Sequence, residues 1–188
     1  MNPMITRDQV HYLAEQCSDA PDEFQSIATR LLKKQRRLSR FFEQNAAPLG
    51  MVPAQVALYM LSVCLRVIEQ VGGRMYKVNS NHIDAATARV NDALGNIFPA
   101  DEGFGERAKG WSDRAQPHLL DEVLWALYDR PDENAEQAHL EDEQKALIYV
   151  LLWTAVEAID MVWQAPEGWD PSSFEAPASD DADESSDD

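Results

Sequence analysis

The sequence predicts an all-α protein: a single-domain bundle of about six helices with a disordered acidic C-terminal tail. Apolar residues recur at steps of three, four and seven over most of the chain, which is the period of an amphipathic helix. No alternation of apolar and polar residues is long enough to predict a strand. With 188 residues, of which 45% are hydrophobic, the chain is long enough to bury one core.

The first two expected helices occupy the N-terminal quarter of the chain. Residues Thr6 to Gln9 have the form of a capping box, in which the Thr6 hydroxyl accepts a hydrogen bond from the Gln9 amide. The helix that follows is expected to end near Cys17. After a turn, a second and longer helix is expected from about Asp22 to Asn45.

A third helix is expected from Pro53 to about Val71, where two glycines, Gly72 and Gly73, allow the backbone to leave in the left-handed conformation. Because its polar residues form one narrow stripe, most of its surface is apolar.

The middle of the chain contains two more expected helices and a loop. Ser80 or Asn81 is expected to cap the fourth helix. Residues 99–117 have no apolar period and contain three glycines, which is typical of a long loop. Pro117 is expected to begin the fifth helix, which ends before Pro131.

The last long helix is expected over about residues 135–164. It and the third helix are apolar on most sides, so we predict that they form the central pair of the bundle. Four of their side chains are predicted to be mostly buried: Val63, Leu65, Leu151 and Val156. Apolar surface left over on these helices would favour a homodimer.

Two segments of different composition divide the chain: a helical domain over 1–166 and an acidic tail over 167–188. Residues 165–188 contain nine acidic residues and no basic one. The rest of the chain has 24 acidic and 16 basic residues, so it is only mildly acidic, although the whole chain has a net charge of −17. A polar, acidic and Pro/Ser-rich tail is expected to be disordered.

Three features predict a cytoplasmic protein with no membrane segment. Cys17 and Cys64 are far apart in the sequence, and neither belongs to a CxxC pair. The N-terminus lacks the apolar run of a signal peptide. The stretch that looks most apolar, 146–156, is too short to cross a bilayer.

A dense basic stripe in residues 30–40 is the candidate binding surface. On a helical wheel its six cations fall on one side and the apolar residues on the other. The six are Arg30, Lys33, Lys34, Arg36, Arg37 and Arg40. Two interpretations are open: a solvated face paired with acids elsewhere in the chain, or a docking face for an anionic macromolecule, an acidic protein or the chain's own tail. No recognisable nucleic-acid-binding motif accompanies the stripe.

A metal site is the alternative. Acidic residues precede two histidines by three positions, a spacing that helical-bundle di-metal sites use because it places both ligands on one helical face. The two pairs are Asp8 with His11 and Glu136 with His139. Such a site also needs two more carboxylates, for which Glu69 and Glu157 are the candidates. In so acidic a chain this spacing also arises by chance, so we assign no metal ligand.

No catalytic motif is present in the sequence. The segment 103–110 does not fit a nucleotide-binding fingerprint, and its Phe104 and Trp111 are expected to pin the loop onto the core. Cys64 lies in an apolar helical pattern, which raises a thiol pKa. We therefore expect a non-enzymatic interaction or regulatory module without a cofactor, with a helical-bundle metalloenzyme as the alternative.

Overall fold

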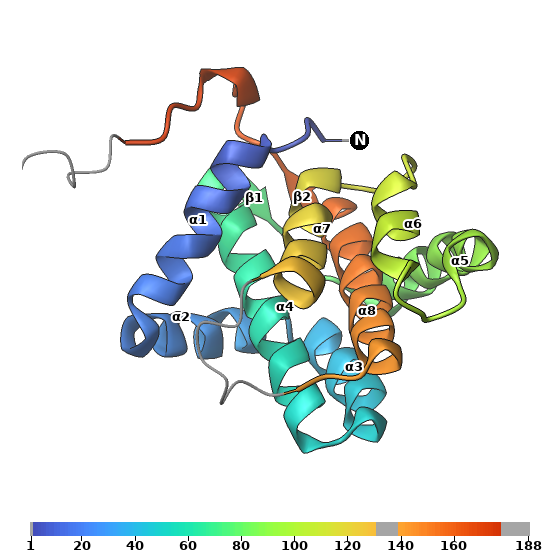
Figure 1. The fold of residues 1–188 in the computed structure, drawn as a ribbon. Coiled ribbons are helices and arrows are strands. Elements are labelled where there is room, and N and C mark those ends of the chain that lie inside the picture. The colour runs from blue at the N-terminus through green and yellow to red at the C-terminus, as the bar shows by residue number, and fades with distance from the viewer. Residues whose placement is uncertain (1, 131–138, 178–188) are drawn as a thin grey trace, which may run out of the picture.

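The computed structural model describes residues 2–130 and 139–177. Within these ranges the fold is all-α, as predicted, with eight α-helices and one pair of two-residue strands (Figure 1). The helices are α1 (Arg7–Asp19), α2 (Pro21–Lys34), α3 (Arg36–Ala46), α4 (Met51–Val71), α5 (Ser80–Ile97), α6 (Phe104–Gly110), α7 (Pro117–Leu124) and α8 (Asp142–Asp160). The shorter elements are β1 (Arg74–Met75), β2 (Trp163–Gln164), the 3-10 turns η1 (Ala47–Leu49) and η3 (Pro171–Ser173), and the π-helical turn η2 (Trp125–Asp129).

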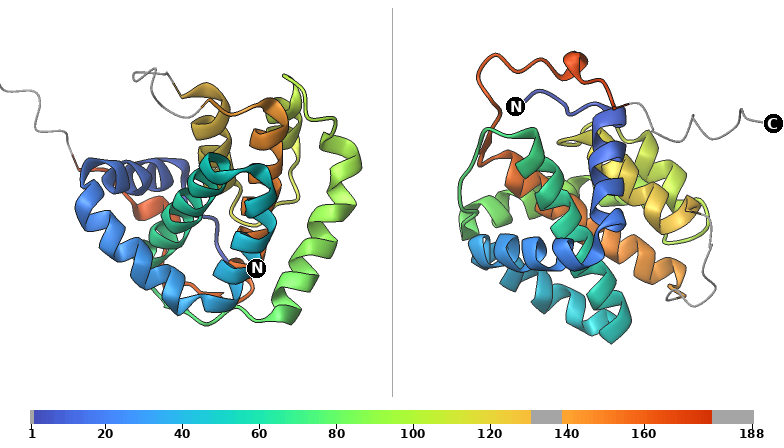
Figure 2. Two further views of the ribbon diagram at one scale, coloured as in Figure 1. Left: turned by 90° about the horizontal axis from the view of Figure 1, so that it is seen from below. Right: turned by 90° about the vertical axis from the view of Figure 1, so that its left-hand side faces the viewer.

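Helices α4 and α8 form the centre of the bundle, which confirms the predicted central pair. They pack against each other, and α1, α2 and α3 also pack on α4. Helix α5 packs on α8, on the side opposite to α4 (Figure 2). Leu65 and Val156 are completely buried, whereas Val63 and Leu151 are only partly buried and contact the core from its edge.

Helix α4, and not the segment 146–156 of α8, contains the longer apolar stretch. Among the described residues it is the one helix long and apolar enough to cross a membrane by length and composition, and half of that apolar stretch is buried inside the fold. Its first turn leaves Met51 and Val52 exposed. The expectations of a homodimer and of no membrane segment both stay predictions.

Local capping rules explain several helix ends. The Thr6 hydroxyl accepts from the Gln9 amide at 3.4 Å, as predicted. Gly72 has a φ of 98°, which confirms the left-handed exit from α4. The predicted cap of α5 is wrong: Asn79, in extended conformation, accepts from the His82 amide at 3.1 Å, and the His82 ring accepts from the Asn79 amide.

The predicted loop and the predicted last helix differ from the structure. The expected loop 99–117 contains α6, which has only seven residues and is too short to show a helical period. Phe104 at its start is completely buried and Trp111 is partly buried, so both contact the core as predicted. The last helix is expected over about residues 135–164, of which 135–138 lie outside the described residues. It begins at Asp142 and ends at Asp160, where the chain turns so that Trp163 pairs with Met75.

The structure describes the predicted acidic tail as far as residue 177. Trp169 packs edge-on against Trp163 at 5.9 Å between ring centroids, and Phe174 lies 5.8 Å from Tyr12 of α1. Residues 178–188, which contain six of the acids of the tail, lie outside the described residues. The disorder of that segment therefore stays a prediction.

Candidate functional site

The basic stripe lies on two helices rather than on the single helix that the sequence predicts. The break between α2 and α3 is at Gln35, whose backbone angles are φ −101° and ψ 46°. The Gln35 side chain is 1% exposed; its Nε2 donates to Tyr76 O at 2.8 Å and its Oε1 accepts from Val78 N at 2.9 Å. A buried amide that satisfies two backbone groups of another segment is costly to displace, so it fixes the break.

A second buried polar residue, Ser39 of α3, also stabilises the break. The Ser39 hydroxyl donates to the carbonyl of Leu32 at 2.8 Å and lies 3.1 Å from that of Gln35. Leu38 and Phe42 are completely buried on the same side of α3. The inner side of the α2–α3 junction is therefore buried and hydrogen-bonded, and the cations lie on its outer side.

All six predicted cations are exposed. Five of them form what we call the basic surface: Lys33, Lys34, Arg36, Arg37 and Arg40. No acidic side chain in the described ranges lies within 4.0 Å of their charged nitrogens. The interpretation that acids elsewhere in the chain neutralise the stripe thus finds no support among residues 2–130 and 139–177.

Arg30 differs from the other five cations because it has an acidic partner. Its guanidinium donates to both carboxylate oxygens of Glu69 on α4, at 2.7 and 2.8 Å, and Arg66 binds the same carboxylate at 2.8 Å. The bidentate Arg30 contact, with Arg66 adding to it, holds the pKa of Glu69 below its ordinary value. Arg30 therefore joins the surface to α4 instead of offering an open charge.

Sequence reasoning missed a neighbouring segment that the fold brings to the basic surface. Because Gln35 binds Tyr76 O and Val78 N, the backbone of Lys77 lies directly beside the break. Lys77 is exposed, and Tyr76 is 45% exposed with the Arg74 guanidinium 5.8 Å from its ring centroid. An exposed aromatic ring among cations is a common feature of polyanion-binding surfaces.

The carboxylates of the metal alternative do not meet in the described structure. Glu69 is held by two arginines, and Glu157 accepts from Ala115 N at 2.8 Å and from Trp153 Nε1 at 2.9 Å. His139 is exposed, and Glu136 lies outside the described residues. Among the residues described, no group of three or more His, Cys, Asp or Glu side chains is placed to hold a metal ion.

Both thiols are buried and free. Burial raises the pKa of Cys17 to about 11 and that of Cys64 to about 12. Because the thiolate is the nucleophilic form, neither cysteine is activated for covalent catalysis at neutral pH.

Comparison with protein-family models, curated proteins and solved structures finds no match for this chain.

Proposed function

We propose that this protein is a non-enzymatic interaction module that binds an anionic macromolecule through the basic surface of α2 and α3. One observation carries the proposal: five exposed cations on adjacent helical turns have no acidic partner in the described part of a chain whose net charge is −17. A cluster of like charges without acidic partners creates a local positive potential, which favours an anionic partner.

The electrostatics favour a polyanion such as a nucleic acid as the partner class. Each cation that contacts a phosphate releases a condensed counterion, so affinity falls steeply with salt. If all five cations make contact, a rise from 50 to 200 mM salt lowers the affinity by roughly 100-fold or more. The acidic remainder of the chain opposes binding at long range, and this repulsion is itself screened by salt.

Fluorescence anisotropy with a labelled 20-nucleotide oligothymidine and with labelled heparin tests the proposal. Binding to at least one of these probes is expected at 50 mM salt, and the Lys33→Glu, Arg37→Glu variant is expected to weaken it more than tenfold. The matched control is Arg7→Glu with Lys109→Glu, which changes the net charge equally at two exposed cations on α1 and α6.

Two results would contradict the proposal. Equal losses in both double variants would show that net charge alone governs binding. If neither probe binds the wild-type protein at 50 mM salt, the basic surface is a solvated face.

A further inference from the structure

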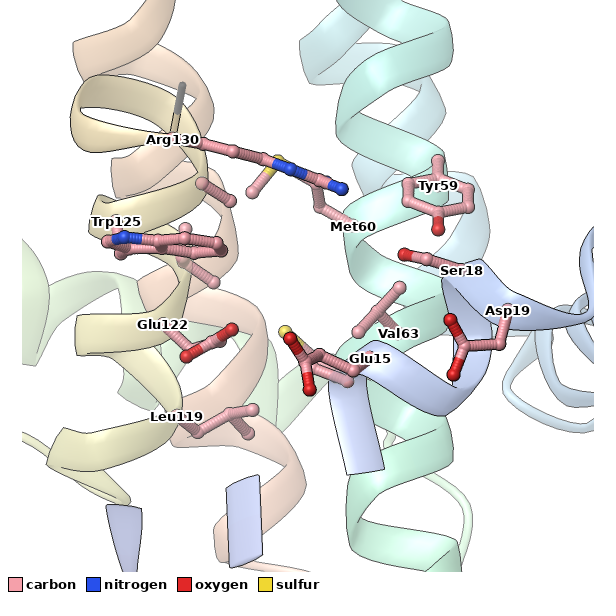
Figure 3. Close-up of a pocket in the computed structure, with 14 residues that line it drawn as sticks. Glu15, Ser18, Asp19, Tyr59, Met60, Val63, Leu119, Glu122, Trp125 and Arg130 are labelled. Atoms are coloured by element: carbon pink, nitrogen blue, oxygen red, sulfur yellow. The ribbon is translucent and has the colours of Figure 1, made fainter. Parts of the chain in front are cut away.

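A groove runs between α1, α4 and the α7–η2 segment, on a part of the molecule separate from the basic surface (Figure 3). Its cavity volume is about 160 Å³. Sites for drug-sized ligands have volumes of roughly 300–1,000 Å³, so this groove fits only a small organic ligand.

The floor of the groove is apolar. It is formed by side chains from α4, α7 and η2: Met60, Val63, Leu119, Val123, Trp125 and Ala126. Tyr59, at the rim, is 44% exposed. Cys64 also lines the groove, and its raised pKa keeps the thiol neutral. This floor suits the hydrocarbon part of a ligand.

The walls of the groove are acidic. Three carboxylates line it, from Glu15, Asp19 and Glu122, against one cation, Arg130. Glu15 and Glu122 point toward each other across the groove (Figure 3). His11 lies between them, with Nε2 3.2 Å from Glu15 and Nδ1 3.0 Å from Glu122.

Two details indicate which charge the groove accepts. Asp19 has no ion-pair partner within residues 2–130 and 139–177, so its carboxylate is available to a ligand. The Arg130 guanidinium lies 5.9 Å from the centroid of the Trp125 ring, so the one cation of the lining is held against this ring and away from Asp19.

We propose that this groove binds a lipophilic amine: a small molecule with an ammonium group on an aromatic or aliphatic body. The body lies on the apolar floor, and the ammonium lies at the acidic wall beside Asp19. An anionic ligand of the same shape is excluded because three carboxylates repel it. This site is independent of the basic surface and selects ligands of the opposite charge.

Three probes with the same body and different charges test the proposal: 4-phenylbutylamine, 4-phenylbutan-1-ol and 4-phenylbutyrate. Titration calorimetry is expected to give the amine a Kd on the order of 100 μM, as befits a ligand of this size in a preformed site. The alcohol is expected to bind several times more weakly, and the carboxylate at least tenfold more weakly. Amide chemical shifts in the NMR spectrum locate the bound amine on α1, α4 and α7.

Variants separate charge recognition from apolar burial. Asp19→Asn with Glu122→Gln is expected to weaken amine binding about fivefold to tenfold and to leave the alcohol unchanged. The control, Glu43→Gln with Asp84→Asn, removes two exposed carboxylates on α3 and α5 and is expected to change neither. Val63→Phe, which fills the floor, is expected to weaken all probes that bind, and circular dichroism checks that each variant is folded.

Several outcomes would overturn the proposal. They are equal affinities for amine and carboxylate, equal losses in the two double variants, chemical shifts away from the groove, or no amine binding at 5 mM. Binding of an amphipathic Leu/Lys peptide to the groove, where the amine fails to bind, would overturn it in favour of a peptide partner.

Discussion

Two groups of arginines in this molecule have opposite surroundings. Arg114, in the loop before α7, is 6% exposed and donates to three groups: Trp111 O at 2.7 Å, Lys109 O at 3.0 Å and Tyr149 Oη at 3.2 Å. It also lies 2.9 Å from a carboxylate oxygen of Asp121. Arg37, on the basic surface, is exposed and has no acidic partner in the described ranges.

The difference shows which arginines hold the fold and which are free to bind a partner. A buried guanidinium that satisfies backbone carbonyls cannot be removed without leaving those groups unpaired. An exposed guanidinium with no acidic partner contributes little to folding and is free to bind another molecule. Removing the first kind of arginine should therefore lower stability, and removing the second kind should weaken binding.

The largest effect is expected from Arg114→Ala. It leaves Asp121 without its cation and two carbonyls without a donor, and should cost about 3–5 kcal/mol of the free energy of unfolding. Arg37→Ala is the matched control and should change stability by less than about 0.5 kcal/mol. Urea denaturation measures both variants. A loss below 1 kcal/mol for Arg114→Ala would mean that this arginine does not hold the loop.

Gln35→Ala is expected to have the next largest effect. It removes the acceptor of the buried Val78 amide and the donor to Tyr76 O, which should cost about 1–3 kcal/mol. Because Gln35 also fixes the angle between α2 and α3, polyanion binding should weaken as well. Gln44→Ala, an exposed position on α3, is the control for both measurements. Unchanged polyanion binding would show that the break does not position the cations.

The amphipathic character of the basic stripe was predictable because it depends only on charges close together in the sequence. The break at Gln35 was not, because its cause is a pair of hydrogen bonds to residues more than 40 positions away. Tyr76 and Lys77 were not predicted as neighbours of the stripe for the same reason: they are far from α2 and α3 in the sequence.

The central pair and the groove show the same difference between local patterns, which the sequence reveals, and contacts between distant segments, which it does not. Helices α4 and α8 were recognised because an almost uniformly apolar helix is a local signature of burial. Val63 is nevertheless only partly buried, because it lines a groove that α4 forms with α1 and α7. Three helices that are distant in sequence supply the groove, so no spacing of Glu15, Val63 and Glu122 predicts it.

Arg30 shares a property with each kind of arginine: it is exposed, as Arg37 is, and it has an acidic partner, as Arg114 has. Its removal tests how much an exposed ion pair contributes to stability. The folded pKa of Glu69 is lowered, first by Arg30, so the pair contributes stability above the ordinary pKa of about 4.5 and loses it as pH falls through the folded value. Since Arg30 is 52% exposed, Arg30→Gln should cost less than about 1 kcal/mol at pH 7. In urea melts, the difference from wild type should shrink as the pH falls below 4. A difference that stays constant while the Glu69 carboxylate becomes protonated would contradict an electrostatic origin.

The smallest expected effect concerns the acidic tail, which we predict competes with external polyanions for the basic surface. Residues 179–188 contain six acids, and tethering gives such a segment an effective concentration on the order of millimolar. Each exposed pair is worth only about 0–1 kcal/mol, so the contact should be loose and sensitive to salt.

Deleting the residues after Ala178 is therefore expected to raise polyanion affinity about twofold to fivefold at 50 mM salt, with little effect at 300 mM. The gain should disappear in the Lys33→Glu, Arg37→Glu background but persist in the Arg7→Glu, Lys109→Glu background, because only the first removes the cations for which the tail competes. A chain with the tail residues in scrambled order should bind as the wild type does, since the contact depends on charge and not on sequence. If truncation raises affinity equally in both backgrounds, the tail acts through net charge, and the exposed arginines of α3 are not its target.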